Sequence, residues 1–267
     1  ALTPLRAAVI EEMDRGERGR AKELAELRTS ILATLPIDPR GSHALGTEVT
    51  LLNLASHAKR LTILEAKGEA IFDWAEDLED WDAMCQLRLQ ISYLHLTKGR
   101  IEETAQMLKE SLEIAQRHQL KRSVEILKRL CFVCIRTGDI EGAATYARES
   151  ALAAEAWGDS LRVGHAYSML SRVNWQAGRF ESAHFYINEA AIRFERVGCR
   201  RGLAEVWNTR GELARASGDY QAAEKAYLEA RDRYESCGSE STVFASVNLC
   251  STWVQAGQFS KANETLD

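Results

Sequence analysis

Ser217-Gly218-Asp219-Tyr220 is one of five short turns that decide the fold of this chain. Each turn joins a glycine to a polar residue and then to Ile, Phe or Tyr, and a small residue stands five positions after the glycine. The five glycines follow one another at steps of 39, 40, 40 and 39 residues. The other four turns are Lys98-Gly99-Arg100-Ile101, Thr137-Gly138-Asp139-Ile140, Ala177-Gly178-Arg179-Phe180 and Ala256-Gly257-Gln258-Phe259. A fixed period of this size indicates a repeat architecture.

Apolar residues on both sides of each turn recur with the period of an α-helix. We therefore expect a first helix before each glycine and a second helix after it. The expected first helices cover residues 81–98, 121–137, 160–177, 200–217 and 240–256, and the second helices cover 101–117, 140–156, 180–197, 220–237 and 259 onward. Gly158, Gly198 and Gly238 follow second helices, where a left-handed residue ends a helix at little cost, and His118 holds the matching place one repeat earlier.

The N-terminal part of the chain follows the pattern only loosely. Residues 3–35 predict a helical hairpin, Pro36 and Pro39 then interrupt the chain, and 43–78 predict a second pair that turns near Lys59 and keeps Gly68 within a helix. We divide the sequence into two degenerate hairpin units over 1–79 and a regular array of five units over 80–267. The fifth unit is short, which favours a fragment of a longer protein.

The composition and net charge of the chain limit the kinds of molecule that it is expected to bind. A net charge of −5 argues against a nucleic-acid-binding surface. No apolar run approaches the roughly 18 residues of a membrane span, and no signal peptide opens the sequence. The 6 cysteines lack the dense spacing of a secreted disulfide scaffold, so we interpret them as reduced thiols of a cytoplasmic protein.

The pattern Gly-x-aromatic/Ile-x-x-Ala, with a small residue seven positions before the glycine, resembles the tetratricopeptide repeat. The small residues before the glycines are Ser92, Cys131, Ser171, Gly211 and Cys250. The period of about 40 exceeds the family's common unit of 34 and is similar to the longer form found in large bacterial signalling and regulatory proteins. The resemblance implies an all-α, right-handed superhelical solenoid of tetratricopeptide-like helix-turn-helix repeats, whose concave face is lined by the first helices.

No catalytic or metal-binding motif stands out against this background. Cys131-x-x-Cys134 is a single pair without further ligands, and both cysteines fall at packing positions. The 6 histidines show no HExxH spacing, and the glycines form no phosphate-binding loop. We therefore predict no catalytic residue, no metal site and no cofactor, and we expect that the chain is not an enzyme.

The candidate binding surface is the face of the first helices found by counting back 3, 6, 10 and 13 residues from each turn glycine. The predicted partner-binding residues are Tyr93, Lys128, Phe132, His165, Arg172, Trp175, Asn208, Glu212 and Arg215. The same count also gives Leu89, Leu96, Ile135, Ser168, Glu205, Phe244, Val247, Ser251 and Val254. Aromatic and arginine side chains are enriched at binding hot spots, and asparagine and arginine can hold a peptide backbone or a carboxylate.

The sequence leaves several interpretations of this face open. The favoured one is a protein- or peptide-binding regulatory domain of a larger, bacterial-type signalling protein, with an output module such as a diguanylate cyclase, a kinase or a transcription regulator outside this sequence. The alternatives are a self-association scaffold that forms a homodimer, and a small-ligand sensor. In a further interpretation, Tyr93, Phe132 and Ile135 are simply buried and Arg172 pairs with Glu212 between adjacent repeats.

Overall fold

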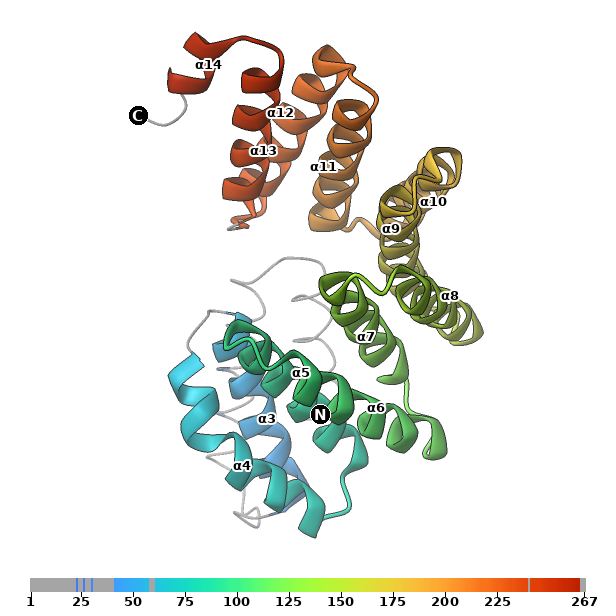
Figure 1. The fold of residues 1–267 in the computed structure, drawn as a ribbon. Coiled ribbons are helices and arrows are strands. Elements are labelled where there is room, and N and C mark those ends of the chain that lie inside the picture. Colours follow the sequence, from blue (N-terminus) through green and yellow to red (C-terminus); the bar gives the residue numbers. More distant parts are fainter. Residues whose placement is uncertain are drawn as a thin grey trace. The chain divides into compact units, whose positions relative to one another are not determined.

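The computed structural model describes Glu23, Glu26, Ser30 and residues 41–57, 61–239 and 241–264 (Figure 1). In these residues the secondary structure is α-helical, without strands. The helices are α3 (Ser42–His57), α4 (Leu61–Asp77), α5 (Trp81–Thr97), α6 (Ile101–Arg117), α7 (Ser123–Thr137), α8 (Ile140–Ala156), α9 (Ser160–Gln176), α10 (Phe180–Val197), α11 (Arg200–Ala216), α12 (Tyr220–Ser236), α13 (Thr242–Gln255) and α14 (Phe259–Glu264). The predicted hairpin at 3–35 lies outside the described residues except at three positions, and so does Lys59.

The all-α fold and the helical hairpins predicted from the five turns are confirmed. Each expected helix from residue 81 onward is present, and its ends lie within two residues of the prediction, apart from the last helix, for which only a start was predicted. α7 begins at Ser123 rather than at 121, because Lys121 and Arg122 form a turn ahead of it. The predicted boundary between degenerate units over 1–79 and regular units over 80–267 concerns the regularity of the repeats. This boundary stays a prediction.

Glycine and aspartate act together at several of the turns. Gly138 and Gly218 have φ angles of 79° and 80°, a left-handed conformation that other residues adopt at a cost. The aspartate that follows each of them begins the next helix: Asp139 Oδ1 accepts from the Gly142 amide at 2.9 Å, and Asp219 Oδ1 accepts from the Ala222 amide at 2.9 Å. A Gly-Asp pair therefore ends one helix and caps the next.

One expectation about a single residue was wrong. The left-handed residue after α6 is Gln119, with φ 51°, and not His118. The His118 ring instead stacks on Trp81, with ring centroids 4.8 Å apart. Gly68 does lie within α4, but a Cβ there would stand 3.6 Å from the nearest Ile91 carbon, which is ordinary van der Waals contact. The helices therefore do not need a glycine at this position to approach each other.

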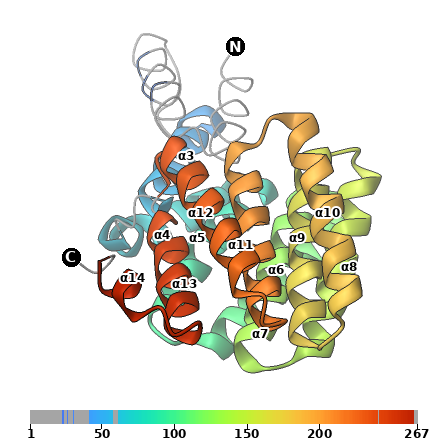
Figure 2. The same ribbon diagram turned by 90° about the horizontal axis from the view of Figure 1, so that it is seen from above.

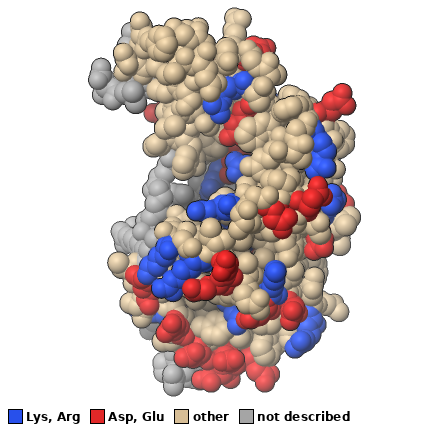
Figure 3. All heavy atoms as spheres, viewed as in Figure 1, with Lys and Arg blue, Asp and Glu red and all other residues tan. Residues whose placement is uncertain are grey.

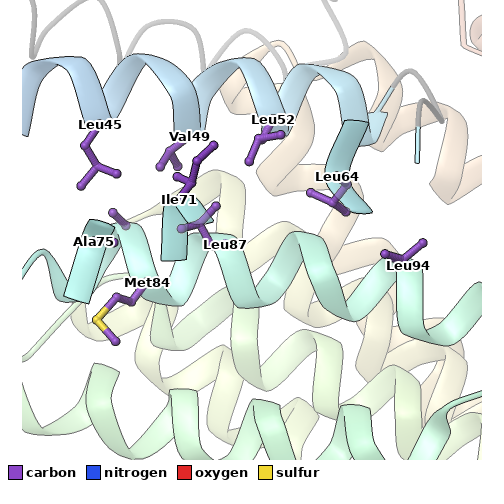
Figure 4. Packing of buried hydrophobic residues seen from close by; sticks show 10 residues of the cluster. Leu45, Val49, Leu52, Leu64, Ile71, Ala75, Met84, Leu87 and Leu94 are labelled. Carbon is purple, nitrogen blue, oxygen red and sulfur yellow. The ribbon is translucent and has the colours of Figure 1, made fainter. Parts of the chain in front are cut away.

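The chain forms two compact units, Ala1–Ala153 and Ala154–Asp267, and the division falls within α8. In the first unit, α3 packs on α4 and α5, α5 packs on α6, and α5 and α6 both contact α7. Figure 4 shows the core where α3, α4 and α5 meet. Its labelled side chains are Leu45, Val49, Leu52, Leu64, Ile71, Ala75, Met84, Leu87 and Leu94.

In the second unit, α9 to α13 lie side by side as successive hairpins (Figure 2). Aromatic residues of the second helices pack directly on glycines of the first helices. The Phe194 ring of α10 contacts Gly164 of α9 and Gly202 of α11, and the Tyr227 ring of α12 contacts Gly211. Gly211 is one of the small positions predicted seven residues before a turn glycine, and its role is to leave room for the Tyr227 ring.

Candidate functional site

One face of α7 in the first unit is not covered by the core. Its residues follow the helical spacing of three and four, and they are Glu125, Lys128, Arg129, Phe132, Ile135 and Arg136. The opposite faces of α7 carry buried residues, among them Leu127, Leu130 and Cys131. Two predicted site residues, Lys128 and Phe132, therefore lie on the outward face, as the spacing rule required.

In the first unit, some apolar residues of the predicted binding face are packed into the hydrophobic core. Leu96 of α5 is only 4% exposed and belongs to the core cluster that α5, α6 and α7 share. Leu89 and Phe132 are half-buried and pack against the same cluster. The interpretation of Phe132 as a packing residue thus applies to part of its ring, whereas Tyr93 keeps some exposed surface without joining this cluster.

Arg129 is a candidate site residue that the spacing rule missed. It stands on the outward face of α7 beside Lys128, and it is half-buried. Burial lowers the pKa of its guanidinium, and the charge of the Tyr93 phenol of α5 acts in the opposite direction. Among the described residues, no carboxylate forms an ion pair with Arg129. The sequence feature that could have identified Arg129 is the Lys128-Arg129 pair itself, because two adjacent basic residues on one helix are rarely both on its buried side.

In the second unit the predicted face is occupied by an ordered set of polar contacts. His165 Nδ1 of α9 lies 3.7 Å from Glu205 Oε2 of α11, and Arg201 Nε lies 3.4 Å from Glu205 Oε1. The His165 ring also meets the edge of Phe194, with centroids 4.9 Å apart. His165 is therefore held between a carboxylate and a buried aromatic ring.

A second set of contacts links α11 to α13. Asn208 Nδ2 donates to Glu212 Oε1 at 3.0 Å, and Asn248 Nδ2 donates to Asn208 Oδ1 at 3.1 Å. Among the described residues Glu212 forms no ion pair with Arg172, so the interpretation in which these two side chains pair is wrong. In the part of the chain that the structure describes, Arg172 has no hydrogen bond or ion pair, and it stays partly exposed.

Arg215 and Trp175, two further predicted site residues, differ in their contacts with the rest of the protein. Trp175 is half-buried and packs against the core cluster of α9, α10 and α11. Arg215 lies beside the buried Tyr227 hydroxyl and interacts with it. Burial raises the pKa of Tyr227 to about 12, and the positive charge of Arg215 opposes the rise.

The face of α13 is apolar and largely exposed. Phe244 is 68% exposed, and Val243, Val247 and Val254 are also exposed. Ala204 and Val124, which occupy the place of Val243 in two earlier first helices, are buried. The surface over α13 in Figure 3 accordingly carries few charged side chains. Isolated exposed apolar residues are normal, but a contiguous group on one helix face indicates a contact surface.

Other features of the described residues do not coincide with this face. A surface depression of about 650 Å³ is lined by α12 and its capping residue Asp219, and none of the nine predicted site residues lines it. No group of three or more His, Cys, Asp or Glu side chains in this part of the chain could hold a metal ion. Cys131 is buried and Cys134 is partly exposed. None of the helices described is long and apolar enough to cross a bilayer.

Comparison with known proteins supports the repeat architecture. A tetratricopeptide repeat model matches residues 204–235, which include most of α11 and α12. No curated protein matches the sequence significantly. Tetratricopeptide-like helical repeats are typical of protein-interaction modules.

Several solved structures have the same fold at low sequence identity. The structure of a Rap protein complexed with competence and sporulation factor matches with a TM-score of 0.73 and 13% identity, over 99% of this chain and 74% of that one. The Cut9–Hcn1 hetero-tetramer of the APC/C matches with a TM-score of 0.71 and 15% identity, over 98% of this chain and 44% of that one. Aspartyl phosphate phosphatase F from Bacillus subtilis matches with a TM-score of 0.67 and 13% identity, over 97% and 66%. This chain is therefore an all-α solenoid of tetratricopeptide-like repeats, and its residues 204–235 carry the sequence of a tetratricopeptide repeat.

Proposed function

We propose that this chain is a protein- or peptide-binding module, without catalytic activity of its own, that contacts its partner through the outward faces of the first helices. In this proposal it is the cytoplasmic regulatory part of a larger bacterial signalling protein, and the output module lies outside the sequence described. The observation that carries the proposal is the arrangement in the second unit, where Arg172 remains unengaged beside side chains that are held in place.

The physical argument rests on preorganisation. Asn208 and Glu212 are fixed by hydrogen bonds, and His165 is held by Glu205, so these groups lose little conformational entropy when a ligand arrives. Arg172 has five donors and no acceptor among the described residues, so a peptide carbonyl or carboxylate could bind it without breaking an existing contact. Recognition of an extended peptide requires such a preorganised surface with a hydrogen-bond donor that is still unpaired.

The proposal is tested by the loss of peptide binding in Arg172→Ala, compared with a control substitution that removes the same charge elsewhere. Arg196 of α10 is exposed and forms no hydrogen bond or ion pair in the described residues, so Arg196→Ala removes the same charge from the same unit. Partners are selected from a displayed peptide library, and affinities are measured by fluorescence anisotropy. We expect Arg172→Ala to weaken binding about tenfold or more, with an unchanged melting temperature, and Arg196→Ala to have little effect. Equal affinities of the two variants would exclude the proposed face.

Self-association is a second candidate, and the apolar face of α13 favours it. Phe244 and Val247 lie on one side of this helix, and neither is covered by the described residues. Light scattering over a range of concentrations measures the mass directly. If α13 forms a dimer contact, Val247→Asp gives a monomer, while Leu152→Asp, at an equally exposed site on α8, leaves the dimer intact. A wild-type protein that stays monomeric would remove this candidate.

A further inference from the structure

Helix α10 carries large apolar side chains on the face that points away from the core of the second unit. Phe185 is 59% exposed and Ile192 is 49% exposed, although the inner face of the same helix is buried. The two residues are seven positions apart, so they lie on one side of the helix, about two turns or about 10 Å from each other. We call Phe185 and Ile192 the apolar pair of α10.

The repeat itself does not require apolar residues at these two positions. The apolar pair stands 7 and 14 positions after the turn glycine Gly178, and the same positions of α6 and α12 carry exposed polar residues. In order, the residues at these positions are Gln106 and Glu113 in α6, Thr145 and Leu152 in α8, and Lys225 and Asp232 in α12. Because the fold accepts polar side chains there, packing between repeats does not explain the apolar pair. Exposed apolar groups that packing does not explain indicate a contact surface.

The Phe185 ring is held in place by a row of aromatic contacts. It meets the Tyr186 ring edge-on, with ring centroids 5.3 Å apart, and the Tyr186 ring lies 5.8 Å from the ring of Tyr167 in α9. The Tyr167 hydroxyl donates to Glu155 Oε1 at 2.5 Å, and the Arg193 guanidinium lies 5.9 Å from the centre of the Tyr167 ring. A ring that is already fixed loses little conformational entropy when a partner covers it, so Phe185 is suited to be a binding anchor.

The charged residues that flank the apolar pair are mainly acidic. Glu181 lies one turn before Phe185 on the same side of the helix, and Glu195 lies one turn after Ile192. Both glutamates are exposed, and Glu181 forms no hydrogen bond or ion pair among the described residues.

The other charges on this side of α10 change the balance little. Glu189, between the two members of the apolar pair, has its Oε2 atom 3.9 Å from the Arg193 guanidinium. Arg196 is exposed at the C-terminal end of the same side. An acidic rim of this kind attracts a partner whose apolar residues are flanked by lysine or arginine, and it repels an acidic partner.

We propose that the apolar pair of α10 is a second docking surface, and that its occupant is an amphipathic helix of a partner protein with basic residues beside its apolar stripe. A helix that lies along α10 presents apolar residues at the same seven-residue spacing, so it can cover both members of the pair. The surface belongs to a second helix, and it therefore goes beyond the proposed function of the first helices and does not depend on it. A module with both surfaces would connect two partners.

The experiment uses three displayed pools of amphipathic helices that share a randomised apolar stripe and differ in the flanking residues, which are Lys, Gln or Glu. Affinities of the selected helices are measured by fluorescence anisotropy. The Lys-flanked helices should bind about threefold or more tightly than the Gln-flanked ones, and the Glu-flanked helices should bind least. This preference should shrink at high salt, because exposed charges are screened.

Substitutions on α10 test the surface itself. Phe185→Ala and Ile192→Ala should each weaken binding of the Lys-flanked helices about tenfold. Phe259→Ala is the matched control, because Phe259 of α14 is exposed to a similar extent in the same unit. If Phe185→Ala fails to fold, Ile192→Ala and Phe185→Leu replace it, and the leucine variant should bind more tightly than Ile192→Ala.

A second pair of variants tests the acidic rim. Glu181→Gln should reduce the preference for Lys-flanked over Gln-flanked helices. Glu235→Gln, at an exposed position of α12, removes the same charge from the same unit and should leave the preference unchanged. Equal preferences in the two variants would show that only long-range attraction operates, and the assignment of the acidic rim would be wrong.

The outcomes distinguish this inference from the proposed function. Arg172→Ala should weaken peptide binding and leave helix binding unchanged, and Phe185→Ala should do the reverse. The inference is wrong if helices from none of the pools bind, or if Phe185→Ala and Phe259→Ala have equal effects, whatever the peptide does. Light scattering gives a further result that would overturn it: a wild-type dimer that Phe185→Ala converts to a monomer would make a second copy of this chain the occupant.

Discussion

We predict that Gly202→Ala destabilises the protein even though Gly202 lies inside helix α11. A Cβ atom at this position would stand 2.5 Å from the Cδ1 atom of Phe194, closer than real Cβ contacts come. The ring cannot move away, because Phe194 is fully buried and its Cδ1 and Cε1 atoms also pack against Gly164 of α9. The first helices of two successive hairpins therefore hold one aromatic ring between their glycines.

The magnitude follows from two opposing effects. Replacing an interior helical glycine by alanine favours the helix by about 0.8–1 kcal/mol. Forcing an extra carbon into a packed core costs typically about 1–3 kcal/mol, and the ring between two backbones places this case at the upper end. The expected net loss in the free energy of unfolding is about 1–2 kcal/mol, which corresponds to a melting temperature lower by about 2–8 °C.

The assay is thermal and urea unfolding followed by circular dichroism, with Gly68→Ala as the matched control. A Cβ at Gly68 of α4 would lie 3.6 Å from Ile91, so the propensity gain is unopposed there. Gly68→Ala should therefore raise the free energy of unfolding by about 0.5–1 kcal/mol. The two substitutions are chemically identical and should have opposite signs.

A double-mutant cycle identifies the contact responsible. Phe194→Leu shortens the ring side chain and should remove most of the cost of Gly202→Ala, with a coupling free energy of about 0.5–3 kcal/mol. The reasoning is refuted if Gly202→Ala stabilises the protein as much as Gly68→Ala does, or if its cost is the same with leucine at position 194.

Three further predictions follow from individual contacts. Arg122 donates two hydrogen bonds to the Asp82 carboxylate, at 3.1 and 2.9 Å. Arg122→Ala should therefore lower the free energy of unfolding, measured with urea, by about 1 kcal/mol. If the effects of Arg122→Ala and Asp82→Asn simply add in the double variant, the two side chains do not stabilise each other and the prediction is wrong. The ion pair with Lys261 lowers the pKa of Glu224 below its usual 4.5, so its stabilisation is present above that pH and is lost as the pH falls through the lower value. Glu224→Gln should therefore show a smaller fall in melting temperature between about pH 7 and pH 3 than the wild type. Gly138→Ala should lower the free energy of unfolding by about 1 kcal/mol, because φ is 79° there, and a neutral effect would contradict the role of the turn.

The candidate site could be predicted only in outline from the sequence. Counting back from the turn glycines placed Lys128 and Phe132 on the outward face of α7, because an α-helix has a fixed period. The same count could not tell that Glu212 is engaged by Asn208 and that Arg172 is left over, since hydrogen-bond partners depend on side-chain positions in neighbouring helices. Arg129 was missed for a related reason, because its burial depends on what surrounds α7.

The sequence by itself determined the helices and turns of this protein, because those depend on local interactions. A left-handed glycine and a capping aspartate act within a few residues, as at Gly218 and Asp219, and the apolar period marks the helices between them. Only the tertiary structure decided which residues are core and which are available to a partner. Phe194 lies between two glycines 38 residues apart in the chain, and contacts at that separation arise from packing that no local pattern encodes.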